Sequence, residues 1–412
     1  MTARTRLLIP VLFAAIVMVS GCTAAPSPQP EPSPAASAPA ASAPAEAFTG
    51  VLGSVLGVPQ PVPATDGRIH LAYELLLSNV LSQSATVESV TVRGDGHDLL
   101  TLSGDDLLPW TMVYGSGMGE RVIGAGQQAL VWLDVTVDSH TDVPTSLDHV
   151  VTISVEQENL PIITSTMVET IAAVALDDVE PIMIGPPLEG DNWLDANSCC
   201  VVTPHRAAVN PIDGRLNVPE RFGIDYVQLD SEGRIFTGDI TDLASYEFYG
   251  ANILAVGDGP IVSMVTDLPE QVPGANPTGL ALAEYGGNNV VQDLGNGHYA
   301  FYAHLQADNP LGLSVGQQLK KGDVLGLLGN TGNTDTPHLH FHVMDSPSPL
   351  ASNGLPFVFD SFELSGIGVS QATLDDAAKG GVFELTTDAA GAREREFPLF
   401  LDLMSYPNVT GK

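Results

Sequence analysis

The sequence is poor in positively charged residues. Among 412 residues only 15 are Lys or Arg, against 49 Asp or Glu, and the formal net charge at pH 7 is -34. A surface this acidic repels phosphate backbones, so nucleic acid is excluded as an expected partner. Attraction to anionic lipids or polymers is weakened for the same reason. We interpret the acidic excess as a solvated surface.

Long apolar runs are also rare, and the one candidate lies at the N-terminus. Arg4 and Arg6 precede an apolar run from Leu7 to Val19, and small residues follow at once, as in a secretory signal. Val19-Ser20-Gly21-Cys22 resembles a bacterial lipobox. That resemblance implies that residues 1–22 are a lipoprotein signal, that Cys22 is lipidated, and that the protein is exported and anchored to the membrane of the cell envelope. The alternative is an ordinary signal peptide whose cleavage leaves Cys22. Residues 23–47 are rich in Ala, Pro and Ser and predict an extended linker.

Cysteine is scarce, and two of the three cysteines are neighbours. Besides Cys22 the chain has only Cys199 and Cys200. In an exported protein they could form a disulfide with each other, stay free, or pair between molecules. A zinc-binding role is less favoured, because the side chains of neighbouring residues in a strand point to opposite faces.

Three histidines recur at every second position near residue 340. In an extended strand His338, His340 and His342 share one face, while Leu339, Phe341 and Val343 pack behind them. Imidazole is a preferred zinc ligand, and a catalytic zinc usually keeps three protein ligands and one open position. The pattern predicts a metal or catalytic site. There is no His-Glu-x-x-His helix, and we expect no serine-hydrolase nucleophile elbow.

The run from Gly287 to Val343 resembles the core of the lysostaphin-like (LytM-type) zinc metallopeptidases. The resemblance is borne by Asn288–Val291, Tyr302-Ala303-His304-Leu305, the turn Val315–Asp323, Gly329-Asn330-Thr331-Gly332 and His338-Leu339-His340. It implies that His340 binds Zn²⁺. It also implies that His304 and His338 are catalytic, orienting the attacking water or stabilising the oxyanion.

The chain departs from that family where the upstream ligands are expected. Arg221-Phe222-Gly223-Ile224-Asp225 fits the pattern His-x-x-x-Asp except at its first position, and arginine has no lone pair to offer a metal. Asp225 remains a candidate ligand. The missing third ligand could be His205, in the same strand-loop-strand unit, or less favourably His342; alternatively, zinc is absent and the domain only binds.

The resemblance implies a zinc metalloendopeptidase that hydrolyses peptide bonds of bacterial peptidoglycan stems or cross-links. A bound zinc lowers the pKa of its water and polarises the scissile carbonyl, while imidazoles move protons near pH 7. Two alternatives are a catalytically silent scaffold that binds the cell wall or activates another wall hydrolase, and a peptidase of small exported proteins.

The strand pattern predicts an all-β protein. Short strands at 69–77, 86–92, 129–135 and 149–155 indicate an immunoglobulin-like β-sandwich over residues 48–191. An antiparallel lysostaphin-like peptidase domain is expected over 192–363, followed by a β extension over 364–412. Within the peptidase domain, 238–249 and 268–283 read as insertions, and the turn at 267–273 is expected at the rim of the cleft.

Overall fold

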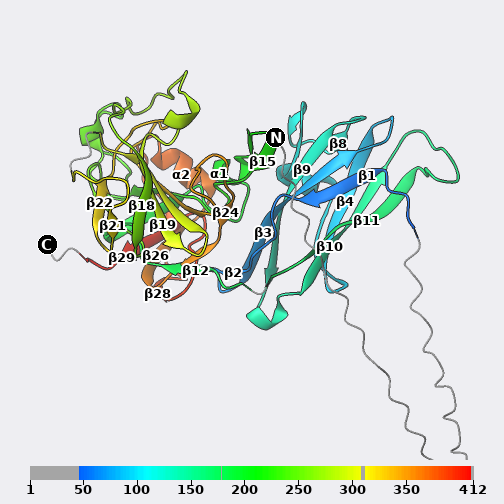
Figure 1. Ribbon diagram of the computed structural model, residues 1–412, viewed down its shortest axis with the longest axis horizontal. Helices are drawn as coiled ribbons and strands as arrows, with labels where there is room; N and C mark the ends of the chain where they lie inside the picture. The colour runs from blue at the N-terminus through cyan, green and yellow to red at the C-terminus, as the bar shows by residue number, and fades with distance from the viewer. Residues whose placement is uncertain (1–45, 178, 308–310, 410–412) are drawn as a thin grey trace, which may run out of the picture. The chain divides into compact units, whose positions relative to one another are not determined.

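The computed structural model describes residues 46–177, 179–307 and 311–409 (Figure 1). The predicted signal, the lipobox with Cys22 and nearly all of the linker lie outside these residues. The chain divides into two compact units, Met1–Ala47 and Phe48–Lys412, and the description below concerns the second. Within the described ranges we find no helix that is both long and apolar enough to cross a membrane.

The first part of this unit is a pair of antiparallel sheets that share one core. One sheet has the order β1 (Val51–Val55), β3 (Ile69–Asn79), β9 (Gln128–Val137), β6 (Thr111–Val113) and β7 (Gly117–Met118), with β2 (Val62–Pro63) beside β3. The other has the order β11 (Thr166–Ala175), β10 (Ser146–Ser154), β4 (Ala85–Gly94) and β5 (His97–Ser103), with β8 (Val122–Ile123) beside β4. The four predicted strands correspond to β3, β4, β9 and β10. The immunoglobulin-like type of this sandwich stays a prediction.

Burial along these strands follows their sequence pattern. Alternate residues of β10 are buried, as expected for a strand with one face on the core and one in solvent. Residues 69–75 of β3 are buried on both faces, including Glu74. The second face of β3 is therefore also covered by protein.

The second part is built on a 12-stranded sheet. Its main path runs β21 (Gln318–Leu319), β18 (Gly259–Val265), β19 (Asn288–Gly295), β20 (His298–Leu305), β23 (Leu339–Met344), β16 (Ile224–Gln228), β13 (Gly190–Ala196), β29 (Asp402–Tyr406), β26 (Phe362–Gly368) and β27 (Leu385–Thr386). β24 (Gly354–Leu355) pairs with β23, and β28 (Gly391–Arg393) pairs with β26. All pairings in this sheet are antiparallel, and β20, β23 and β16 are adjacent.

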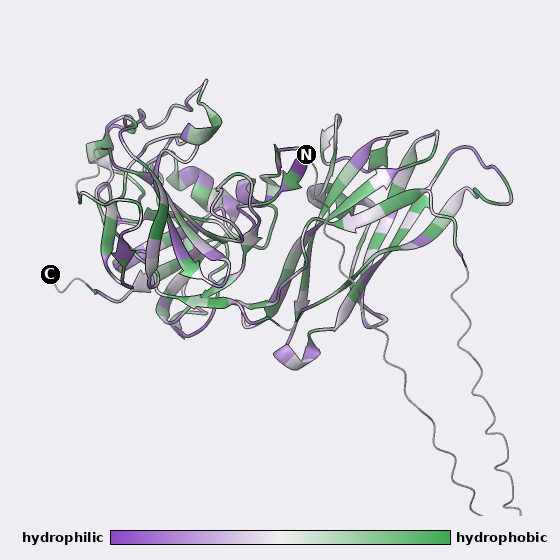
Figure 2. Cartoon of the chain, viewed as in Figure 1, coloured by the Kyte–Doolittle hydropathy of each residue, from purple (hydrophilic) through white to green (hydrophobic). Residues whose placement is uncertain are grey.

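Smaller elements surround this sheet. They are the parallel pair β12 (Ile182–Ile184) and β25 (Phe357–Phe359), the pairs β14 (Asn210–Ile212) with β15 (Arg215–Asn217) and β17 (Asn252–Leu254) with β22 (Val324–Leu327), and the helices α1 (Pro204–Ala207) and α2 (Gln371–Ala377). Short 3-10 turns occur at Gly104–Trp110, His140–Asp142, Leu243–Ser245 and Leu282–Glu284. The all-β prediction is confirmed, because strands dominate the described ranges (Figure 2).

The long sheet extends past the boundaries expected from sequence. β13 begins at Gly190, and β26 and β29 belong to the segment predicted as a C-terminal extension. Leu364, Met404 and Tyr406 are buried in the same core cluster as Phe341 and Tyr226. The C-terminal strands therefore complete the sheet that bears the histidines.

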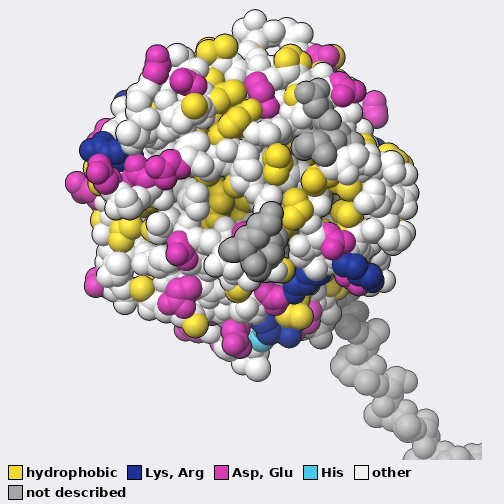
Figure 3. Space-filling model, turned by 90° about the vertical axis from the view of Figure 1, so that its left-hand side faces the viewer, with side chains coloured by type: hydrophobic (Ala, Val, Ile, Leu, Met, Phe, Trp, Pro, Cys, Tyr) yellow, Lys and Arg dark blue, Asp and Glu magenta, His cyan; other side chains and the backbone are white. Residues whose placement is uncertain are grey.

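Asp and Glu side chains are spread over the face shown in Figure 3, where Lys and Arg occur in only a few places. This agrees with the formal charge of the chain.

Candidate metal centre

Two neighbouring strands and one short helix bring the candidate ligands together. Asp225 on β16 is the register partner of His340 on β23, and His205 lies on α1. One donor atom from each of these residues lies within 4.8 Å of the other two. His304, at the end of β20, and His338, just before β23, line the same cleft.

His205 is held in the tautomer that a metal ligand needs. Its Nδ1 lies 2.9 Å from the carbonyl oxygen of Gly223, to which it donates, so the lone pair is on Nε2. Nε2 lies 3.1 Å from Oδ2 of Asp225. Thr203 caps α1 by accepting a hydrogen bond from the backbone N–H of Arg206, which fixes the turn that presents His205.

Asp225 is the point at which the site converges. Its Oδ2 accepts a hydrogen bond from Nδ2 of Asn197 at 2.9 Å. Its Oδ1 lies 3.0 Å from Nδ1 of His340 and 3.2 Å from Nε2 of His338. Burial tends to raise the pKa of Asp225, but the positive charge of His205 and His338 outweighs it and holds this pKa well below 3.8. The carboxylate is thus ionised, as a metal ligand must be.

The donor set fits zinc. Two imidazoles and one carboxylate are a common catalytic zinc set, with a fourth position left for water or substrate. His340 would offer Nδ1, because its Nε2 lies 2.9 Å from Nδ1 of His342. His342 therefore contacts a candidate ligand and does not belong to the converging group of three.

The two predicted catalytic histidines are also fixed through Nδ1. Nδ1 of His304 lies 2.7 Å from the carbonyl oxygen of Thr331, and Nδ1 of His338 lies 2.7 Å from that of Thr336. Each donates there and keeps a lone pair on Nε2. Their ring centroids are 4.6 Å apart. His304 has φ +62°, a left-handed backbone conformation that is uncommon for residues other than glycine and is often found at functional sites.

The environments of His304 and His338 push their pKa values in opposite directions. Burial, with the nearby charges of His338 and His340, holds the pKa of His304 well below 6.5. Burial also disfavours the charged form of His338, but Asp225 outweighs it and raises the pKa of His338. In the metal-free protein His304 is the base of the pair and His338 the acid.

Arg221, at the position where the family resemblance expects a ligand, faces away from this group. Its Nη2 lies 2.5 Å from Oε2 of Glu74, and its Nε is 3.0 Å from the same oxygen. Nη1 donates to the carbonyl oxygen of Gly354 at 3.2 Å. The guanidinium is thus occupied by a carboxylate and a carbonyl.

The candidate metal group opens into a cleft of about 860 Å³. Its lining includes Glu220, Tyr285 and Phe301, and it also includes Asn276, Leu282 and Ala283 from the predicted insertion 268–283. The turn at 267–273, expected at the rim, is not among the lining residues, because later residues of the segment take that place. The cleft is long enough for a peptide to lie across the histidines.

The cysteines lie beside a second histidine and aspartate. Cys199 and Cys200 form a disulfide, with S–S 2.05 Å. His70, Asp134 and Cys200 also have donor atoms within 4.8 Å. The sulfur of Cys200 is bonded to Cys199, however, and His70 is paired with Asp66 and Asp134 at 3.2 and 3.0 Å. This group is therefore an ion-paired histidine beside a disulfide, not an open metal site.

Sequence reasoning missed Asn197 and did not examine one serine motif. Asn197 lies in a loop, and no pattern in the sequence singles it out. Gly312-Leu313-Ser314-Val315-Gly316 matches the letters of a Gly-x-Ser-x-Gly motif. It lies in a turn before β21 and no helix follows it, so it does not form the strand-to-helix elbow of a serine hydrolase.

Comparison with known proteins bears on the β19–β24 region. Residues 241–352 match the model of Peptidase family M23. The predicted resemblance is confirmed. The M23 segment contains His304, His338, His340 and His342, but it begins after His205, Arg221 and Asp225.

Two curated relatives are endopeptidases by name. The chain is 29% identical over 113 residues to the glycyl-glycine endopeptidase ALE-1 of Staphylococcus capitis, a match that covers 26% of each chain. It is 36% identical over 66 residues to the peptidoglycan DD-endopeptidase ShyA of Vibrio cholerae serotype O1, covering 16% of this chain and 15% of ShyA. The similarity thus spans about a quarter or less of either relative.

Two solved structures were also matched. One is the catalytic domain of lysostaphin from Staphylococcus simulans, with TM-score 0.21, 20% identity, 40% of this chain and 88% of that chain covered. The other is a putative M23 peptidase from Pseudomonas aeruginosa, with TM-score 0.24, 14% identity, 65% of this chain and 90% of that chain covered. At these TM-scores the likeness supports no structural argument.

Proposed function

We propose that this protein is an exported, membrane-anchored zinc metalloendopeptidase that hydrolyses peptide bonds of peptidoglycan stems or cross-links. The observation that supports it most is the convergence of His205, Asp225 and His340 in one cleft, with the Nε2 atoms of His304 and His338 beside them. The M23 segment and the endopeptidase relatives favour a peptidase. Anchoring rests on the lipobox resemblance at Cys22.

When bound, zinc would supply a Lewis acid and lower the pKa of a coordinated water. His205 Nε2, Asp225 and His340 Nδ1 would hold it. His304, neutral because it is buried, can accept the proton of the attacking water at Nε2. His338 can donate from Nε2 to the developing oxyanion or to the leaving amine.

The test uses the full chain and purified wall sacculi. Zinc content is measured by atomic absorption, and release of amino groups from sacculi is followed before and after chelation and zinc re-addition. We expect about one zinc per chain, loss of cleavage on chelation, and recovery with zinc. His340→Ala should lose both metal and cleavage, whereas the exposed His97→Ala should keep both.

A scaffold without catalysis is the competing function, because Arg221 occupies an expected ligand position. Protein that takes up no zinc at neutral pH and leaves sacculi intact would establish the scaffold instead. Cleavage of a small exported protein, with sacculi untouched, would redirect the proposal to another substrate. Comparing oligoglycine peptides with D-alanyl cross-linked peptides then identifies the bond that is cut.

A further inference from the structure

A buried carboxylate of the sandwich contacts the part of the chain that bears the candidate ligands. Glu74 lies on β3, opposite Trp132 of β9, and its side chain is 0% exposed. A buried carboxylate is costly unless it is paired. Its partner is Arg221, which donates through both Nε and Nη2. Such two-point pairs fix geometry as well as charge.

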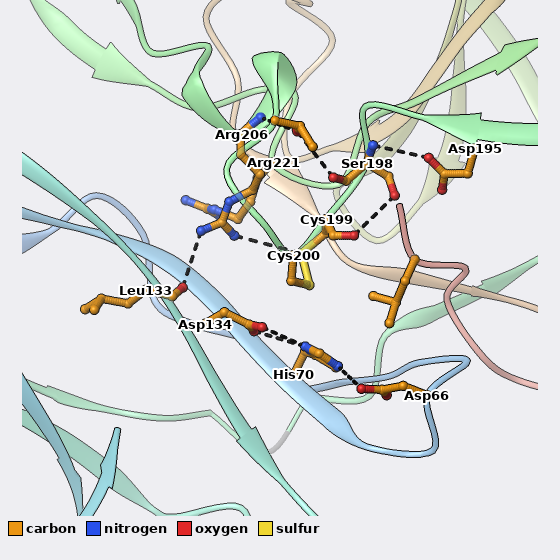
Figure 4. Close-up of a disulfide and its surroundings, with 12 residues drawn as sticks. Asp66, His70, Leu133, Asp134, Asp195, Ser198, Cys199, Cys200, Arg206 and Arg221 are labelled. Atoms are coloured by element: carbon orange, nitrogen blue, oxygen red, sulfur yellow. Dashed lines mark hydrogen bonds and ion pairs between the residues drawn. A yellow bond between two sulfur atoms is a disulfide. The ribbon is translucent and has the colours of Figure 1, made fainter. Parts of the chain in front are cut away.

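A second arginine approaches the same carboxylate. Nη2 of Arg206 lies 4.0 Å from Oε1 of Glu74 and donates to the carbonyl oxygen of Leu133 at 3.3 Å. Figure 4 shows Arg206 and Arg221 close together beside the Cys199–Cys200 disulfide, with Leu133 in front of them. Arg206 is 1% exposed, so its charge depends on Glu74 for compensation.

These two arginines stand next to the candidate ligands along the chain. Arg206 directly follows His205, and Arg221 lies one short turn before Asp225. Arg221 also donates to the carbonyl oxygen of Gly354, and Gly354 pairs with Met344 on β23, the strand of His340. Each of the three segments that present a candidate ligand is therefore joined to Glu74 by at most two contacts.

We propose that Glu74 is a positioning residue for the metal centre, so that the sandwich sets the affinity of the peptidase part for zinc. This inference rests on the proposed function. It gives the sandwich a role in this chain: Glu74 neutralises the arginine that stands in place of the expected ligand and holds the segment from which His205 replaces that ligand.

The experiment compares Glu74→Gln with Glu169→Gln in the full chain. Glu169 is the matched control, since it is also a buried sandwich glutamate, 3% exposed, but it accepts hydrogen bonds from the backbone of Gly50 and Val51. Amide hydrogen exchange is measured in metal-free protein for peptides covering 203–207 and 220–226. Zinc affinity is measured by competition with a chromophoric chelator.

For Glu74→Gln we expect faster exchange in both peptides and a zinc affinity lower by about tenfold or more, the range found when outer partners of metal ligands are lost. Glu169→Gln should match the wild type in both measurements. If the two glutamine variants behave alike, Glu74 has no positioning role.

Two further results keep the inference testable. If Glu74→Gln does not fold, Arg221→Lys replaces it, because lysine keeps the charge but cannot make the two-point contact. Wild-type exchange and zinc affinity in Arg221→Lys would overturn the inference. A wild-type protein that binds no zinc would refute the proposed function instead, while the exchange data still decide whether Glu74 orders the two segments.

Discussion

Nε2 of His205 lies 3.1 Å from Oδ2 of Asp225, although one residue is on a short helix and the other on a strand. The carbonyl oxygen of Gly223 fixes the tautomer of His205 from the opposite side of the ring. His205 therefore stands where a third ligand is needed, while Arg221 points to Glu74.

We expect His205→Ala to lower zinc affinity by more than about 100-fold, because losing a ligand costs more than losing an outer partner of a ligand. Competition with a chelator measures it, and His97→Ala is the control for an exposed histidine. Undiminished affinity in His205→Ala would mean that the third ligand lies elsewhere.

Part of this site is predictable from the sequence, because it follows local periodicity. The alternation of His338, His340 and His342 places one face of a strand, and proximity in the chain relates His205 to Asp225. The partner of Arg221 is not predictable in this way, since Glu74 lies 147 residues earlier in the sequence. The tautomers of the histidines are likewise set by backbone carbonyls of Gly223, Thr331 and Thr336, whose positions exist only in the folded chain.

The limits of the peptidase sheet show the same difference. Burial of Leu364 and Met404 depends on pairing of β26 with β29 and of β29 with β13. Strand patterns predict that such strands exist. They do not predict which distant strand each one joins.

His304→Asn should leave zinc affinity unchanged and lower kcat by about 10²- to 10⁴-fold, because the general base is lost while the ligands remain. Asparagine is the suitable replacement, since it tolerates the positive φ of this position better than most residues. Zinc content and the rate of sacculus cleavage are measured on the same sample. Loss of zinc together with activity would contradict this role and make His304 part of the metal-binding set.

His342 is expected to orient His340. Nε2 of His340 is 2.9 Å from Nδ1 of His342, and ligand histidines are usually fixed through their second nitrogen. His342→Ala should lower zinc affinity by about tenfold, whereas His342→Gln, which keeps an acceptor, should restore part of it. Equal affinity in wild type and His342→Ala would show that His340 needs no such support.

Arg221→His tests whether the family's ligand position still faces the ion. Histidine cannot reproduce the two-point pair with Glu74, so a buried carboxylate is left poorly paired, at a cost of about 3–5 kcal/mol in the free energy of unfolding. We expect lower stability in urea and no gain in zinc affinity. A variant that binds zinc more tightly than the wild type would show that position 221 can reach the metal.

Asp402 should make stability depend on pH without involving the metal centre. Its carboxyl is 1% exposed and accepts hydrogen bonds from Thr65 and from the backbone of Leu399, and burial raises its pKa from 3.8 to about 7. Between these values the folded state binds the proton more tightly than the unfolded state, so this contribution is fully present below about pH 4 and is lost as pH rises through 7.

Asp402→Asn cannot ionise, so the wild type should lose stability relative to this variant by up to about 4 kcal/mol between pH 4 and pH 8. Urea unfolding of both chains at several pH values, with chelator present, measures the difference. Asp106→Asn, at an exposed position, should run parallel to the wild type across the same range. If the curve for Asp402→Asn is parallel as well, the carboxyl of Asp402 does not titrate in this window. A downward slope in the wild type alone would locate a proton at Asp402 in the folded protein, away from the ligands whose protonation governs zinc binding.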